Sequence, residues 1–268
     1  MTAADRTGST LAFVVLTFAL SWSLWFAAGV TSPGGPNQLL FLLGVFSPGI
    51  VAIGLTAFTG GRFALTTLLR RLIDWEVPAR WYVFAAFYMV AIKLTTALVH
   101  RVAFGAWPVF GQEPLLLMVG ATVASTMMGV QAGEELGWRG YALPKLADRF
   151  GLPVASVLLG VIWALWHLPL FWAPVGDTFG QSFPLYLLQV VALSVTIAWL
   201  YSNTRGSLLP VMLLHAAVNN TKDIVPSVDR GATDIWSLSH SPVAWITVAL
   251  MWLCAGYLLI RMRGQSKA

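Results

Sequence analysis

Two adjacent carboxylates stand at the end of an apolar stretch, Glu134 and Glu135, and Arg139 follows them. If a helix continues past Gly137, Glu135 and Arg139 lie at i and i+4 on one face, with the acid preceding the base, which favours an ion pair. Glu134 is then rotated by about 100° from Glu135 and need not share that cation. We therefore expect one carboxylate to be a structural brace and the other to be available for chemistry.

Two histidines and an asparagine lie in later apolar segments. His167 follows Trp163 by one helical turn, and His215 precedes Asn219 by one turn. Residues four apart share a helix face, so Trp163 can pack over His167, and His215 and Asn219 can donate hydrogen bonds to one point. Each pair alone is more often ordinary helix packing or interhelical hydrogen bonding. Together with a spare carboxylate, they supply a base, a water-orienting group and oxyanion donors, the parts of a hydrolytic site.

The elements that carry these residues must be membrane helices. The 268 residues are 57% hydrophobic and only 10% charged, and the mean hydropathy is +0.75. This composition cannot cover a water-soluble globule with polar surface. The net charge of +5 therefore indicates basic cytoplasmic loops, not nucleic-acid binding, and the bilayer is the expected partner. The lone Cys254 excludes an intramolecular disulfide or a Cys-rich metal site.

Apolar runs near the length of a bilayer span, about 20 residues, divide the sequence into eight segments. We place them at residues 11–31, 37–59, 81–100, 115–136, 152–173, 183–201, 207–221 and 243–261. They predict an all-α, polytopic membrane protein with about eight transmembrane helices around a polar intramembrane cavity. No charged tail, low-complexity tract or repeat interrupts the chain, so we expect a single membrane domain over residues 1–268, with the polar motifs in a core at residues 115–225.

The basic residues predict the orientation. With the N-terminus in the cytoplasm and eight alternating spans, twelve of the sixteen Lys and Arg residues lie inside and three lie outside. This asymmetry predicts a multi-pass protein of the cell membrane with both termini cytoplasmic. The remaining cation, Lys93, falls within a span; we expect it to snorkel towards an interface, and the alternative is a pair with Glu134 or Glu135.

Three ordered motifs resemble those of a known family, the CPBP intramembrane proteases, which include type II CAAX prenyl endopeptidases and bacteriocin-processing or self-immunity proteins. The motifs are Glu134-Glu135-x3-Arg139, an aromatic-x3-His ending at His167, and His215-x3-Asn219. They cover residues 134–219, whereas the first four spans match the family only in being apolar. The family's second motif usually begins with Phe and this chain has Trp163, so we expect a changed pocket shape with retained chemistry.

The resemblance implies a role for each motif residue. Glu134 would activate the attacking water, and His167 would help to hold it. His215 and Asn219 would stabilise the oxyanion, while the Glu135–Arg139 pair would support the arrangement. No cofactor is certain. Members of the family are often called metalloproteases, and His167, His215 and Glu134 would suffice for a zinc site with an open position. Glu134 with His167 could equally polarise water without a metal, which is the mechanism we favour.

Two functions from different classes follow. The leading one is an intramembrane endopeptidase that hydrolyses peptide bonds of membrane-associated or lipid-modified, CAAX-like peptides, with a cavity opening towards the cytoplasm and the bilayer. The alternative is a non-catalytic membrane protein, either a bacteriocin self-immunity protein or an ion or solute transporter. A transporter would usually show inverted repeats or matching broken helices, and the sequence shows no such symmetry.

Overall fold

The computed structural model describes residues 3–30, 37–172, 178, 181–227 and 234–265 of the chain, and all the regular structure among them is helical. This confirms the predicted all-α class. The helices are α1 (Ala3–Val30), α2 (Gln38–Arg70), α3 (Ala79–Phe104), α4 (Leu115–Met127), α5 (Ala132–Glu135), α6 (Leu143–Phe150), α7 (Leu152–Trp166), α8 (Phe183–Asn203), α9 (Leu209–Thr221) and α10 (Pro242–Gln265). A π-helical turn, η1 (Leu136–Ala142), joins α5 to α6, and short 3-10 helices, η2 (Leu168–Phe171) and η3 (Lys222–Ile224), follow α7 and α9.

Each of the eight predicted spans carries helix, but fewer than eight are long enough to cross a membrane. Among the described residues, α1, α2, α3, α8 and α10 meet that length, and the bent pair of α4 with the segment Ala132–Phe150 makes a possible sixth span. The helices α7 and α9, of 15 and 13 residues, fall short of the roughly 20 residues that a bilayer core requires. Two of the eight predicted spans thus form shorter apolar helices; α9 is mostly buried, whereas α7 also presents exposed residues such as Val154 and Leu158.

The fourth predicted span is broken. The helix α4 ends at Met127, Gly129 adopts a positive φ of 68°, and the chain bends by 45° before α5 begins at Ala132. The helix does run on past Gly137, as the predicted ion pair required, but as a π-helical turn. Such turns are rare and occur frequently at functional sites.

Close contact with α2 fixes the position of this broken segment. A Cβ atom added at Gly49 would lie 2.8 Å from the carbonyl oxygen of Gly133, and one added at Gly137 would lie 2.6 Å from the backbone of Pro48. Small residues let membrane helices approach backbone to backbone. The two glutamates between Gly133 and Gly137 are therefore held against α2.

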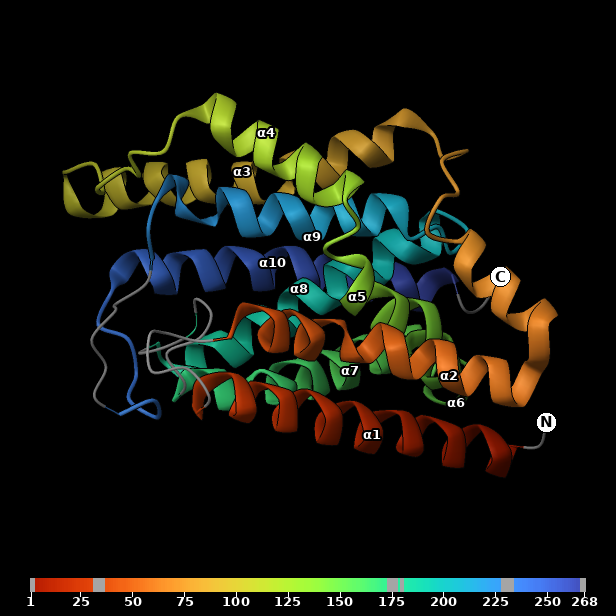
Figure 1. Ribbon diagram of the computed structural model, residues 1–268. Helices are drawn as coiled ribbons and strands as arrows, with labels where there is room; N and C mark the ends of the chain where they lie inside the picture. Colours follow the sequence, from red (N-terminus) through yellow and green to blue (C-terminus); the bar gives the residue numbers. More distant parts are fainter. Residues whose placement is uncertain (1–2, 31–36, 173–177, 179–180, 228–233, 266–268) are drawn as a thin grey trace.

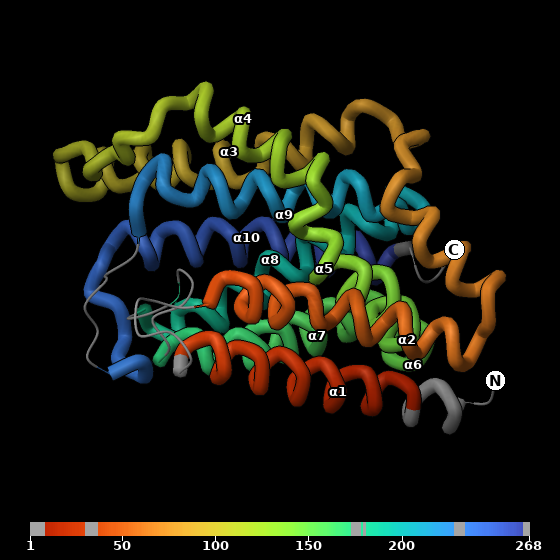
Figure 2. Tube along the Cα trace, in the orientation of Figure 1, coloured from red at the N-terminus to blue at the C-terminus, as the bar shows by residue number. Residues whose placement is uncertain are grey.

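The two ends of the bundle differ in charge. The helix α1 begins and α10 ends at the same end, on the right in Figures 1 and 2, together with loops 71–78 and 204–208; we call this the terminal end. The opposite end, which we call the far end, carries residues 105–114, 181–182, 222–227 and 234–241. The described basic residues in helix ends or loops of the terminal end are Arg62, Arg70, Arg71, Arg80, Lys145, Arg149, Arg205, Arg261 and Arg263. Arg101 and Lys222 lie towards the far end, so the cations on which the predicted orientation depends are concentrated at one end of the fold.

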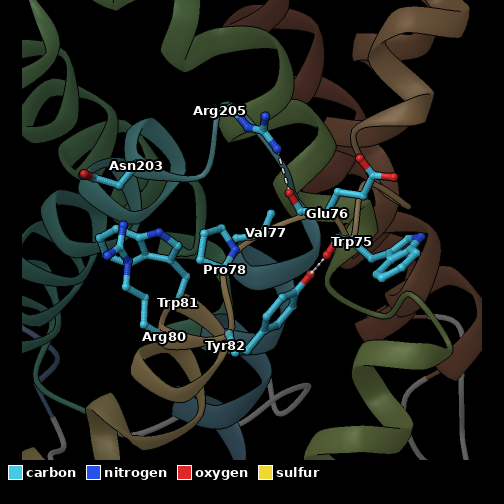
Figure 3. Close-up of a pocket in the computed structure, with 10 residues that line it drawn as sticks. Trp75, Glu76, Val77, Pro78, Arg80, Trp81, Tyr82, Asn203 and Arg205 are labelled. Carbon is cyan, nitrogen blue, oxygen red and sulfur yellow. Dashed lines mark hydrogen bonds between the residues drawn. The ribbon is translucent and has the colours of Figure 1, made fainter.

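Backbone-directed hydrogen bonds join the loops of the terminal end, which also forms a shallow pocket (Figure 3). Arg205 donates to the carbonyl of Glu76 at 2.7 Å, and the Tyr82 hydroxyl donates to the carbonyl of Trp75 at 3.0 Å. The Trp75 side chain is largely exposed, and across the pocket Arg80 lies over the Trp81 ring, 5.2 Å from its centroid. Aromatic and basic side chains gathered in this way are typical of the membrane–water interface.

Candidate active site

The ion pair expected between Glu135 and Arg139 is present deep inside the protein. One guanidinium nitrogen of Arg139 lies 2.9 Å and 3.1 Å from the two carboxylate oxygens of Glu135, and both side chains are fully buried. The same carboxylate binds Nδ1 of His215 at 2.8 Å. An unpaired charge buried in this way would cost about 3–5 kcal/mol. The two partners of Glu135 therefore hold its carboxylate firmly in place.

Glu134 faces away from that pair and lines a cavity. Its Oε2 atom accepts a hydrogen bond of 2.8 Å from the indole nitrogen of Trp163. Glu134 is among the residues lining the cavity, whereas Glu135 and Arg139 are not. The rotation of about 100° per helical residue has therefore separated two neighbouring carboxylates into different surroundings.

One cavity of about 430 Å³ brings together the four residues predicted to do chemistry. Glu134 comes from α5, His167 from the C-terminal end of α7, and His215 and Asn219 from α9. The volume falls within the range of about 300–1,000 Å³ that is usual for small-molecule sites. Three segments far apart in the sequence thus contribute polar groups to one cavity.

Hydrogen bonding assigns a proton position to His167. Its Nδ1 atom lies 2.9 Å from the carbonyl oxygen of Trp163, and a carbonyl can only accept, so Nδ1 carries the proton. The rings of Trp166 and Tyr186 lie 4.6 Å and 5.5 Å from the imidazole, centroid to centroid, and fix its orientation. His167 is therefore held with a defined ring orientation on the wall of the cavity.

The contact between His215 and Glu135 was not predicted from the sequence. We expected His215 to act with Asn219, its neighbour on the same face of α9, and both residues do line the cavity. With Nδ1–H donating to Glu135, however, the His215 ring can donate from Nε2 only when both nitrogens carry protons. The carboxylate beside it is the group that stabilises this doubly protonated form.

Trp163 lies at the centre of the site. Besides the bond to Glu134, its ring lies 4.2 Å from the Arg139 guanidinium carbon and meets the His215 ring edge-on at 5.3 Å between centroids. We predicted only that Trp163 would pack against His167, and those ring centroids are 5.9 Å apart. A buried indole N–H usually has a hydrogen-bond partner, and this rule was the available signal for a polar neighbour.

Lys93 also lines this cavity, and the prediction that it snorkels to an interface was wrong. Its side chain is buried, and the ammonium group donates to the carbonyl of Val225 at 3.0 Å and to the hydroxyl of Ser227 at 2.9 Å. It forms no ion pair with Glu134 or Glu135, the alternative partners considered. The segment that follows α9 supplies both acceptors, and no periodicity argument could have placed that segment beside α3.

The zinc site considered from the resemblance does not fit the donor positions. Within the described parts of the chain, no three His, Cys, Asp or Glu side chains are grouped as metal ligands. The hydrogen bonds do not decide this, because Glu134 keeps one carboxylate oxygen and His215 keeps Nε2. Because these side chains are not grouped as ligands in the described residues, we derive no catalytic step through a metal.

The cavity lies in the half of the bundle away from the termini. Helices that run from the terminal end contribute residues from their second half, such as Trp25 and His167, and α10, which runs towards that end, contributes Thr247 from its first half. The lining also reaches Gln181 and Asp223 at the far end. We expected the cavity to open towards the cytoplasm and the bilayer; the structure places its lining residues Gln181 and Asp223 at the end of the bundle opposite the termini.

Fold and site together define a class of protein: a polytopic helical membrane protein with a carboxylate, two imidazoles and an amide on the wall of one cavity. Comparison with known proteins is more specific. The model of a family described as type II CAAX prenyl endopeptidase Rce1-like matches residues 114–221, the segment that carries all three motifs. A curated relative, the CAAX prenyl protease 2 of Methanococcus maripaludis, is 24% identical to this chain over 80% of the chain and 83% of the relative. The resemblance drawn from the motifs is confirmed by both.

Proposed function

We propose that this protein is an intramembrane endopeptidase of the CAAX type, which hydrolyses a peptide bond in a membrane-associated, lipid-modified peptide. The observation that carries the proposal is the single cavity shared by Glu134, His167, His215 and Asn219. The matched family and the curated relative, both described by their action on CAAX prenyl proteins, support the substrate class. The apolar wall of the cavity, which includes Phe41, suits a lipid-modified chain.

In the proposed mechanism, Glu134 and His167 hold a water molecule between them. Glu134 takes a proton from this water as its oxygen attacks the carbonyl carbon of the scissile bond. The carbonyl oxygen becomes an oxyanion, which His215 and Asn219 stabilise by hydrogen bonds. When the carbon–nitrogen bond breaks, the proton held by Glu134 passes to the departing amine, so that water is consumed and two peptides are released.

The Glu135–Arg139 pair supports this arrangement without reacting. By binding Nδ1 of His215, Glu135 fixes the imidazole ring and favours the form that can donate from Nε2. Arg139 balances the charge of Glu135 and lies against the Trp163 ring, which in turn holds Glu134. One buried ion pair thereby positions groups on both sides of the scissile bond.

The test of this function is cleavage by the purified protein in lipid nanodiscs. A farnesylated peptide with a C-terminal CAAX sequence is the substrate, and mass spectrometry of the products is the measurement. We expect release of the C-terminal tripeptide by the wild-type protein and no release by His167→Ala, with folding of the variant checked by its unfolding temperature. An intact peptide after incubation with the folded wild-type protein contradicts the proposal.

Chelation tests the metal-free form of the mechanism. Because water is activated by Glu134 and His167 alone in this account, cleavage after treatment with EDTA should stay within about twofold of the untreated rate, and metal analysis should find less than one bound zinc per chain. Loss of cleavage on chelation with recovery on adding Zn²⁺ would show that a metal takes part.

We further propose a cell-membrane location with both termini in the cytoplasm, supported by the cations of the terminal end. A peptide then reaches the cavity from the other face of the membrane or from within the bilayer. In a Cys254→Ala background, a cysteine placed at Asp223 should react with an impermeant maleimide on intact cells, and one placed at Arg263 only after permeabilisation. The reverse pattern contradicts the orientation, and labelling of both sites from one face contradicts the position of the cavity.

A further inference from the structure

A buried cation stands on the wall of the candidate active site, and no acidic side chain among the described residues is paired with it. Lys93 lies near the middle of α3, is 2% exposed, and lines the same cavity as Glu134 and His215. A charged side chain inside a membrane protein is costly, and where it occurs it usually has a counter-ion or a function. Nothing in the proposed mechanism uses Lys93.

The contacts of Lys93 solvate its charge but do not neutralise it. An ammonium group has three N–H donors, and two of them are taken by the neutral oxygens of Val225 and Ser227. The acidic residue whose charge acts on Lys93 from nearby is Asp223, and its carboxylate is paired with Lys222 at 2.9 Å. Among the described residues, no carboxylate forms an ion pair with Lys93 itself.

We infer that Lys93 binds the terminal α-carboxylate of the substrate, and that this contact selects peptides with a free carboxyl end. The inference rests on the proposed function and specifies its substrate. The Glu134 carboxylate in the same cavity would repel an approaching anion, so a cation is required to hold a negatively charged chain end there. In a CAAX sequence, three residues separate the scissile bond from the terminal carboxylate, and an extended chain of three residues spans about 10 Å.

The cavity offers a second cation, which provides the matched control. Lys222 also lines it, but this side chain is paired with Asp223 and is 27% exposed. A cation that is already paired and partly exposed gains less from a new carboxylate than a buried cation with neutral partners. Substitution of Lys222 should therefore leave the preference for a free carboxyl end in place.

The experiment compares two farnesylated CAAX peptides that differ only at the C-terminus, one a free acid and the other an amide. For the wild-type protein, we expect kcat/KM to be at least about tenfold higher for the acid, as for loss of a charge-assisted hydrogen bond. Lys93→Gln, which keeps donors for Val225 and Ser227, should cleave both peptides at rates within about twofold of each other. Lys222→Gln should keep the wild-type ratio.

Each remaining outcome has a defined meaning. Equal rates for the two peptides with the wild-type protein overturn the carboxylate assignment while leaving the endopeptidase proposal intact, and cleavage of neither peptide overturns both. A preference that persists in Lys93→Gln, or that disappears in Lys222→Gln, overturns the assignment to Lys93. If Lys93→Gln does not fold, the deciding measurement is the ratio of kcat/KM for the acid and amide peptides in the wild type, Lys222→Gln and Lys93→Arg. Both variants should keep the wild-type ratio. Loss of the preference in folded Lys93→Arg overturns the assignment.

Discussion

The outer helices and the interior segments of this bundle differ in length, continuity and surroundings. In α1, 28% of the apolar window is buried, compared with 67% in α8, and α2 and α3 likewise present much of their surface outwards. The segments that carry the site, α5, η1, α7 and α9, are short or distorted, and α5, η1 and α9 are mostly buried. A continuous helix satisfies its own backbone in lipid, whereas broken helices are tolerated at that depth only where protein surrounds them. The outer helices therefore make the irregular interior possible.

Side-chain chemistry follows the same division. Phe58 and Leu116 are 90% and 84% exposed, as expected for positions that face lipid, whereas Glu135 and Arg139 are completely buried. A lipid-facing position tolerates change because hydrocarbon surrounds it before and after the substitution. An interior charge depends on one partner in one geometry. Substitutions of the same kind should thus have very different effects in the two regions.

The largest effect on stability is expected for Glu135→Gln. Removing this carboxylate leaves Arg139 buried without a counter-ion, which costs about 3–5 kcal/mol for a buried pair. We expect a much lower unfolding temperature in detergent and a low yield of folded protein. The matched control is Glu113→Gln at an exposed position, which should stay within about 0.5 kcal/mol of the wild type. Equal stability of the two variants would show that the buried pair is not a structural support.

A smaller effect is expected where α2 meets the interior. A Cβ atom at Gly49 would lie 2.8 Å from the Gly133 carbonyl oxygen, whereas one at Gly54 would meet nothing within 4 Å. Gly49→Ala should therefore destabilise the protein by about 1–3 kcal/mol, the usual cost of overpacking, and should also lower activity by shifting α5. Gly54→Ala, on the outer face of the same helix, should be neutral or slightly stabilising. Thermal unfolding of both variants decides whether the two faces of α2 differ in this way.

The smallest effect concerns Trp163→Phe, which removes the N–H donor to Glu134 and keeps an aromatic ring. We expect kcat to fall about tenfold, equivalent to about 1.4 kcal/mol, with KM little changed, because Glu134 loses the donor that positions its carboxylate. A variant with wild-type kcat would show that the indole N–H does not position Glu134.

The sequence predicted the local features of the site better than its long-range contacts. The spacing of Glu135 and Arg139 was enough to predict their ion pair, and hydropathy located all eight apolar segments. Residue spacing shows which side chains share a face of one helix, but not which neighbouring helix packs against that face. The hydrogen bonds of Glu135 with His215 and of Glu134 with Trp163 were therefore not predicted.

Helical periodicity in the sequence also did not distinguish an α-helix from a π-helix. The spacing of residues 136–142 fits an α-helix, but the structure has a π-helical turn there, and this turn packs against α2, where Gly137 meets the backbone of Pro48. The position of the cavity near the far end, and the burial of Lys93 beside it, depend likewise on how whole helices are arranged.

The central claim is that adjacent carboxylates have separate functions, and Glu134→Gln tests it most directly. Glutamine keeps an oxygen to accept the Trp163 hydrogen bond but cannot take a proton from water. The measurement is cleavage of the farnesylated CAAX peptide together with the unfolding temperature of the same preparation. We predict that cleavage falls at least about 1,000-fold, or about 4 kcal/mol, while the unfolding temperature stays within experimental error of the wild type. Wild-type cleavage by a folded Glu134→Gln protein would contradict the account.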